Sequence, residues 1–240
     1  ILIINHALGQ ELDYNPSPVL GPYNESFWDT SFEEFSQKCQ PVYDAIKLVR
    51  SELDESKSLI GFAAAPYTLC KYMYNSPKLD IVNKLIPYIV EHLASQIEYG
   101  CDTIQIFDSW AGDIPANQFD DYVINPTKEI VDAIRKRYPD VGIIAFPRLV
   151  GTKINEYIEV VNADCTNISD DLPVDEIAGE VLQGGISISR LIKGEDITPV
   201  LDKMRDKAYV VNLAHGIDKT TPVENVRQFV NTVKEYRKGV

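Results

Sequence analysis

The sequence is short of positive charge. Its 240 residues include 23 Lys and Arg but 36 Asp and Glu, so the net charge at pH 7 is −13 when the histidines are neutral. A chain with this balance has no overall basic field that would capture nucleic acid or an anionic membrane surface. We therefore expect no nucleic-acid partner, and we expect any polyanionic ligand to be met by local cations.

Long apolar runs and leader segments are missing as well. The longest charge-free apolar stretch, over residues 59–70, is too short for a membrane span and contains Pro66. The opening residues 1–4 are apolar and come without an initiator Met, a basic region or a cleavage site, which excludes a signal peptide. These features predict a cytoplasmic protein without a membrane partner. They also predict that a strand has already begun at Ile1 and that the chain is incomplete at its N-terminus.

The signatures of metal, nucleotide and covalent chemistry are absent too. Cys39, Cys70, Cys101 and Cys165 form no CxxC pair and none lies beside a histidine, which indicates buried thiols rather than zinc ligands or disulfides. No GxGxxG or Walker motif occurs, and no serine lies in a nucleophile elbow. The sequence therefore predicts a hydrogen-bonding site without a metal and without an obvious cofactor anchor.

What the sequence does contain is a regular alternation of short apolar runs and stretches of helical period. Six runs are apolar on successive residues, as strands buried on both faces require. They cover residues 59–63, 103–107, 142–146, 163–168, 181–186 and 209–213, and residues 1–4 are a seventh candidate. This alternation predicts a parallel α/β protein, and the lack of nucleotide-binding motifs disfavours an open doubly wound sheet. We expect a (β/α)8 barrel of the TIM type that lacks its first βα unit, forming a single domain over residues 1–240.

Start and stop signals mark the helices between these runs. Gly100 follows an apolar stripe over residues 81–99 and predicts the end of that helix, while Pro87 inside the stripe predicts a kink or a late start. Asn125 and Pro126 have the pattern of an N-cap and a first helical residue. Residues 221–224 have the pattern of a capping box with proline in the first turn.

In a barrel, the chemistry lies just beyond the carboxyl ends of the strands. That rule selects Tyr72, Asp108, Ser109, Arg148 and His215. Each also has a plainer interpretation. Tyr72 could be a core aromatic, Ser109 a helix cap and Asp108 a partner of backbone amides. Arg148 could form a salt bridge at the rim, and His215 a structural hydrogen bond.

Four segments, in order along the chain, resemble the uroporphyrinogen decarboxylase family. Residues 60–69 with 72–73 resemble its IGFAGAPWTL…YM segment, and residues 105–112 match its QIFDSWAG. Residues 212–217 with 221–226 resemble NLGHGI…TPxENV, and residues 1–4 with 7–9 resemble DILVVPQALG. Together these segments cover nearly the whole chain.

The resemblance implies a (β/α)8 barrel, a homodimer and no cofactor. It also implies that uroporphyrinogen is the substrate and that carbon dioxide is removed from its four acetate side chains to give coproporphyrinogen in haem synthesis. Carried over residue by residue, the substrate-binding side chains are Tyr72, Ser109 and His215. The protonated pyrrole ring would act as its own electron sink, so the protein need only supply a proton, stabilise positive charge and hold carboxylates.

Some parts of the family's sequence pattern are missing from this chain or altered in it. The family's RQAGR loop and its central Asp would both precede Ile1, so the catalytic residue is unknown within this sequence and the 240-residue chain alone is expected to be poorly active. Residues 167–170 and 182–188 have drifted from the family pattern. Two alternatives are a zinc-dependent methyltransferase of the same superfamily, which would need a His-x-Cys pair, and a non-catalytic barrel that binds tetrapyrroles or partners.

Overall fold

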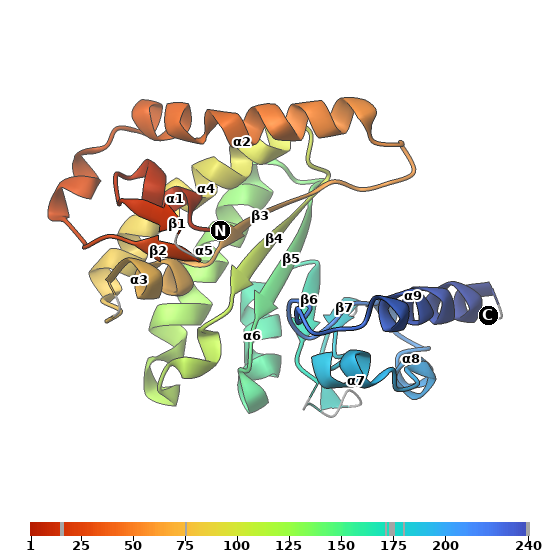
Figure 1. Ribbon diagram of the computed structural model, residues 1–240. Coiled ribbons are helices and arrows are strands. Elements are labelled where there is room, and N and C mark those ends of the chain that lie inside the picture. Colours follow the sequence, from red (N-terminus) through yellow and green to blue (C-terminus); the bar gives the residue numbers. More distant parts are fainter. Residues whose placement is uncertain (15–16, 75, 171, 173–175, 180, 239–240) are drawn as a thin grey trace.

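The computed structural model describes residues 1–14, 17–74, 76–170, 172, 176–179 and 181–238. Its centre is a six-stranded sheet in the order β3-β4-β5-β6-β7-β8, in which each strand pairs in parallel with the next (Figure 1). The strands are β3 (Ile60–Ala64), β4 (Thr103–Asp108), β5 (Gly142–Pro147), β6 (Cys165–Ile168), β7 (Val181–Gly184) and β8 (Ala208–Val210). The six predicted runs and the parallel α/β class are therefore confirmed. The sheet is open in this structure, with β3 and β8 as its edge strands.

The central strands are buried because helices cover them. In β5 every residue after Gly142 is buried, and in β4 four of the six residues are buried. Residue pairs such as Asp108 and Pro147 lie side by side in the β4–β5 register, so the two strands end at the same level. The loops that follow the strands are therefore gathered at one edge of the sheet, which we call the carboxyl edge.

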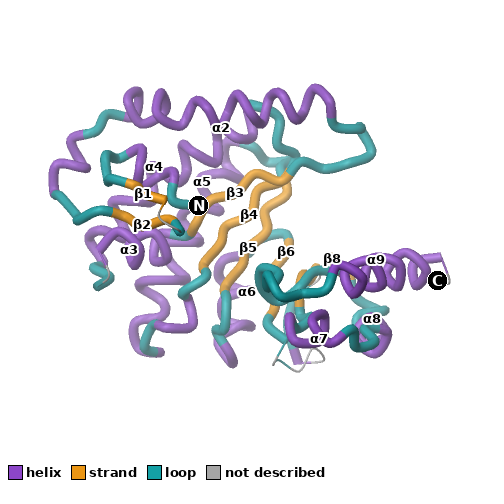
Figure 2. Tube along the Cα trace, viewed as in Figure 1, coloured by secondary structure: helices purple, strands orange, loops and turns teal. Residues whose placement is uncertain are grey.

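The helices pack on the sheet and on one another. Helix α4 packs against β3 and β4 and against four helices, α1, α2, α3 and α5. The tube view separates these helices from α7, α8 and α9, which gather near β8 (Figure 2). The helices are α1 (Ile3–Ala7), α2 (Phe32–Glu52), α3 (Pro66–Tyr74), α4 (Leu79–Glu98), α5 (Asn125–Arg137), α6 (Ile154–Val161), α7 (Ile188–Lys193), α8 (Thr198–Lys203) and α9 (Val223–Lys238).

A short hairpin lies between α1 and α2. Its strands β1 (Leu12–Tyr14) and β2 (Pro18–Leu20) pair in antiparallel fashion. The Gln10 side chain ties the hairpin to α3, because its Nε2 donates to the carbonyls of Gly21 at 2.7 Å and Met73 at 3.0 Å. Both bonds are made by a buried amide, which fixes the hairpin against the rest of the molecule.

The seventh predicted strand, over residues 1–4, is wrong. The chain forms helix α1 there instead, and the backbone N–H of His6 donates to the carbonyl of Leu2. Ile4, Ala7 and Leu8 are buried at helical spacing, and α1 packs on α2 and α4. A run of four apolar residues fits a strand or one buried helical turn equally well, so the pattern alone could not decide between them.

Two of the predicted helix starts also differ in detail. Asn125 does not cap α5, because a π-helical turn (Asp120–Ile124) leads into the helix without a break, although Pro126 does lie in the first turn. Helix α9 starts close to the predicted position, but Thr221 Oγ1 is buried without a hydrogen-bond partner among the described residues, so the capping box does not form. Gly100 ends α4 with φ +118°, as predicted, and Pro87 lies inside that helix.

His92 of α4 is buried beside α2, and its Nδ1 lies 3.1 Å from the hydroxyl of Tyr43. Burial lowers the pKa of His92 to about 4. Because this value lies below the ordinary pKa of about 6.5, the stability that comes from burying the neutral ring is complete above pH 6.5 and is lost as the pH falls towards 4.

We expect acid to unfold the protein partly through His92. The difference in unfolding free energy between the native protein and His92→Gln should shrink by up to about 3 kcal/mol from pH 7 to pH 4. Urea denaturation at a series of pH values measures it, with His6→Gln, a change at an exposed histidine, as the control. A difference that is independent of pH would contradict this role of His92.

Candidate functional site

The polar residues that follow the strands meet at the carboxyl edge. Ser109 comes directly after β4, and Arg148 directly after β5. His215 follows Leu213, which bridges to Ile186 just beyond β7. Tyr72 lies on α3, the helix that begins immediately after β3. The rule that chemistry follows the strand ends therefore selected residues from a single edge of the sheet.

Tyr72 and the turn that carries Ser109 lie next to each other. The Tyr72 ring meets the Trp110 ring edge to face, with 6.1 Å between the centroids, and Tyr72 is 40% exposed. Lys71 Nζ lies 4.1 Å from the centroid of the same indole and pairs with Asp113. Tyr72 is therefore an aromatic side chain at the rim of the edge rather than a core residue.

A buried carboxyl group lies beneath this turn. Thr68 Oγ1 donates to Asp108 Oδ1 at 2.5 Å and accepts from the backbone N–H of Trp110 at 3.3 Å. The other carboxyl oxygen of Asp108, Oδ2, is buried and has no hydrogen-bond partner among the described residues. Burial raises the pKa of Asp108 to about 7, although the bond from Thr68 acts in the opposite direction. Asp108 thus fixes the Ser109–Trp110 turn through Thr68, and not through backbone amides as one interpretation of the sequence had it.

The turns after β4 and β5 are joined by their backbones. The N–H of Arg148 donates to the carbonyl of Asp108 at 3.1 Å, and the carbonyl of Arg148 accepts from Gly112 at 3.0 Å. Leu149 follows with φ +58°, a left-handed conformation that is uncommon for leucine. Its N–H donates to Ser169 Oγ at 3.2 Å, which connects the turn to the end of β6.

His215 and Arg148 line one cavity of about 220 Å³ at this edge. The other polar side chains that line it are Ser169, Asp170, Ser187 and Ser189. Partial desolvation and the positive charge of Arg148 hold the pKa of His215 below its usual value, although a bond to the backbone at Gly216 acts in the opposite direction. The imidazole is therefore neutral at pH 7 and can serve as a hydrogen-bond donor or acceptor.

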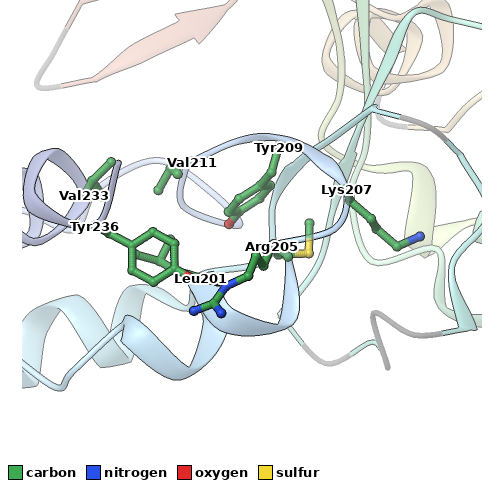
Figure 3. A pocket seen from close by; sticks show the side chains of 8 residues that line it. Leu201, Arg205, Lys207, Tyr209, Val211, Val233 and Tyr236 are labelled. Carbon is green, nitrogen blue, oxygen red and sulfur yellow. Dashed lines mark hydrogen bonds between the residues drawn. The ribbon is translucent and has the colours of Figure 1, made fainter. Parts of the chain in front are cut away.

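A larger cavity, of about 730 Å³, lies elsewhere, between α8, β8 and α9 (Figure 3). Its walls are mostly apolar, and its polar groups are already engaged. Arg205 Nε donates to the Tyr236 hydroxyl at 3.2 Å, Lys207 Nζ to a backbone carbonyl at 3.0 Å, and the Tyr209 hydroxyl to another at 2.5 Å. Its lining residues run along β8 from Lys207 to Val211, and none of them lines the cavity of Arg148 and His215.

Thiol and metal chemistry find little support in the described residues. Burial raises the pKa of each of the four cysteines to about 11, so none is a ready thiolate. Within the described ranges, no group of three or more His, Cys, Asp or Glu side chains is arranged to hold a metal ion. The zinc-dependent alternative would need such a group of ligands. None of the described helices combines the length and the apolar character that a membrane crossing needs.

The predicted residues thus form two groups, which lie in two halves of the carboxyl edge. Tyr72 contacts Trp110, the neighbour of Ser109, whereas His215 shares its cavity with Arg148. The link between these two halves is the backbone of the β4 and β5 turns. Sequence reasoning missed Thr68, whose hydroxyl organises the first half, because a threonine in an apolar helix carries no signal of such a contact.

Gly112 offers a test of how tightly the two turns are packed. A Cβ atom added at Gly112 would lie 2.3 Å from the carbonyl oxygen of Leu149, whereas one at Gly216 would meet nothing within 4 Å. We expect Gly112→Ala to lower the unfolding free energy by about 1–3 kcal/mol, because backbone must move to relieve the contact, and Gly216→Ala to change it little. Chemical denaturation of both variants measures this, and equal stability of the two would contradict the packing described.

The raised pKa of Asp108 gives a second test. The stabilisation of the protonated carboxyl is complete below its ordinary pKa and is lost as the pH rises through about 7. Asp108→Asn should therefore gain stability relative to the native protein between pH 4 and pH 7, by up to about 4 kcal/mol, and the gain should level off above that range. Thermal unfolding across this range measures it, with Asp132→Asn at an exposed acid as the control. A gain that does not vary with pH would show that the carboxyl is not desolvated.

Comparison with known proteins identifies the relatives of this chain. Residues 1–79 and 78–236 match the family described as uroporphyrinogen decarboxylase (URO-D). The uroporphyrinogen decarboxylase of Rickettsia bellii is 35% identical, and the match covers 98% of this chain and 78% of that protein. That of Wolbachia pipientis wMel is 34% identical, with coverage of 98% and 77%.

Solved structures with low sequence identity share the fold. A methyltransferase from Methanosarcina mazei superimposes with a TM-score of 0.75 at 16% identity, covering 99% of this chain and 78% of its own. A B12-independent methionine synthase from Shewanella sp. W3-18-1 gives a TM-score of 0.60 at 14% identity, covering 82% and 67%. These likenesses concern the fold alone, whereas the sequence match extends over nearly the whole chain. The chain therefore belongs to the uroporphyrinogen decarboxylase family.

Proposed function

We propose that this protein is a uroporphyrinogen decarboxylase, a carboxy-lyase that converts the four acetate side chains of uroporphyrinogen to methyl groups and releases coproporphyrinogen. The observation that carries the proposal is the carboxyl edge of the sheet. There, Tyr72, Ser109 and His215 lie on three of the four segments in which the sequence resembles the family, and each follows a strand of the parallel sheet. We assign these three side chains to substrate binding.

The proposed reaction needs no electron acceptor other than the substrate. Protonation of a pyrrole carbon next to the acetate gives a cationic ring, and the bond to the carboxylate carbon then breaks. The electron pair of that bond moves into the ring as carbon dioxide leaves. A second proton taken up at the side-chain carbon, together with loss of the ring proton, yields the methyl group. The protein must therefore hold the anionic arms and stabilise a transient positive charge.

The residues of the carboxyl edge suit the first of these tasks. Tyr72 and Ser109 offer hydroxyl groups, and the neutral ring of His215 offers an N–H. Arg148 supplies positive charge beside His215 in a chain whose net charge of −13 would otherwise repel an octacarboxylate. In keeping with the family resemblance, the proposal includes a homodimer of single-domain barrels in the cytoplasm that acts without a cofactor.

The direct test uses the protein expressed from its complete gene. Its substrate, uroporphyrinogen, is prepared enzymatically or by chemical reduction of uroporphyrin and is kept under anaerobic conditions. Chromatography of the oxidised products separates porphyrins with eight, seven, six, five and four carboxyl groups. We expect the tetracarboxylate to accumulate. If the octacarboxylate is recovered unchanged from folded protein, the proposed function is wrong.

His215→Ala separates a binding role from a structural one. Loss of one hydrogen bond to a charged group should lower kcat/KM about ten- to hundredfold and leave the melting temperature nearly unchanged, because the side chain is exposed. His6→Ala is the matched control. A large drop in melting temperature with unchanged turnover per folded molecule would remove His215 from the site.

A further inference from the structure

Arg148 differs from the other arginines of this protein. The other six arginines whose side chains are described each pair with an Asp or Glu within 4 Å. Arg148 forms no such pair among the described residues, although it is half-buried and Asp170 lines the same cavity. A partly buried guanidinium group is costly unless an anion meets it. Among the described residues, Arg148 is thus the arginine that no acidic side chain neutralises.

The backbone presents Arg148 to the cavity at a cost in conformational energy. Its N–H and its carbonyl are both held, by Asp108 and Gly112, and the next residue, Leu149, is left-handed and half exposed. Such a conformation costs of order 1 kcal/mol or more for a residue other than glycine and persists only where the surroundings impose it. The hydrogen bond from Leu149 to Ser169 is part of that constraint. The strained turn thus fixes the position from which the guanidinium enters the cavity.

The remaining polar groups of the cavity match a single carboxylate. Serine hydroxyls at positions 169, 187 and 189 line it together with the neutral imidazole of His215. A guanidinium group binds a carboxylate through two parallel hydrogen bonds, and hydroxyl groups can donate further hydrogen bonds to the carboxylate oxygens. The volume of about 220 Å³ accommodates one carboxylate arm and not a tetrapyrrole ring system. Asp170 limits the negative charge that the cavity accepts.

We propose that Arg148, Ser169 and His215 form a carboxylate subsite that holds one carboxylate arm of the tetrapyrrole substrate while another arm reacts. This inference rests on the proposed function for the identity of the ligand. It makes Arg148 a substrate-binding residue, and Asp170 the residue that tunes the strength of that binding.

Direct binding tests the subsite without turnover. Oxidised uroporphyrin I, an octacarboxylate that cannot react, is titrated into the protein from the complete gene, and tryptophan fluorescence gives Kd. We expect Arg148→Gln to raise Kd about ten- to hundredfold, Arg148→Lys to raise it less, and Asp170→Asn to lower it a few-fold. Arg227→Gln, an exposed arginine on α9 paired with Glu224, should leave Kd unchanged. Circular dichroism and melting curves establish that each variant is folded.

The outcomes separate this inference from the proposed function. If the wild-type protein binds uroporphyrin and the variants show the expected order of Kd, but the protein does not decarboxylate, the subsite is retained and the proposed function is refuted. Normal decarboxylation with native Kd and KM in folded Arg148→Gln would overturn the subsite alone, as would a wild-type protein that fails to bind the octacarboxylate. In the active protein, an equal loss of kcat/KM at all four decarboxylations would assign a propionate to the subsite. A loss confined to the early steps would assign an acetate.

Discussion

The hydrogen bond between Thr68 and Asp108 is the interaction on which the carboxyl edge depends. It joins the helix after β3 to the end of β4 across 40 residues of sequence, and both groups are buried. The same threonine oxygen receives the N–H of Trp110, and the Asp108 carbonyl receives the N–H of Arg148. Three consecutive strand ends are thereby held in a fixed relation. A buried polar network of this kind specifies one arrangement because each member that lost its partner would be left desolvated and unpaired.

The arrangement of these strand ends matters because it positions Arg148 in a chain with an excess of negative charge. A protein with an excess of 13 negative charges tends to repel a polycarboxylate, so the positions of its few cations decide where such a ligand can settle. Most of the described arginines are neutralised by acidic partners at the surface, and Lys71 is paired with Asp113. No acidic side chain among the described residues pairs with Arg148, which lines a cavity where a charge interacts more strongly than it does in water.

How much of this could be predicted from the sequence depends on the range of the interactions involved. Strands β4 and β5 are apparent because consecutive apolar residues are what a doubly covered strand requires, and the residues at their ends follow directly. The run at residues 1–4 failed because four apolar residues carry too little periodicity to separate a strand from a helical turn. The bond from Thr68 and the left-handed conformation of Leu149 depend on contacts between distant segments, which no local pattern records. The sequence thus located Tyr72, Ser109 and His215 at strand ends, but it could not show which of them would share a cavity.

The link between the β4 and β5 turns has a consequence for how this site can change. Arg148 is held from both sides by main-chain atoms of Asp108 and Gly112, so the contact contains no side chain that a point substitution could remove. A substitution can disturb this contact at Gly112, because a side chain there would collide with the carbonyl of Leu149. The backbone contact between the Trp110 turn and the Arg148 turn is therefore available whatever side chains the neighbouring positions carry. In related sequences this contact would leave its trace at Gly112, because the other atoms that form it belong to the main chain.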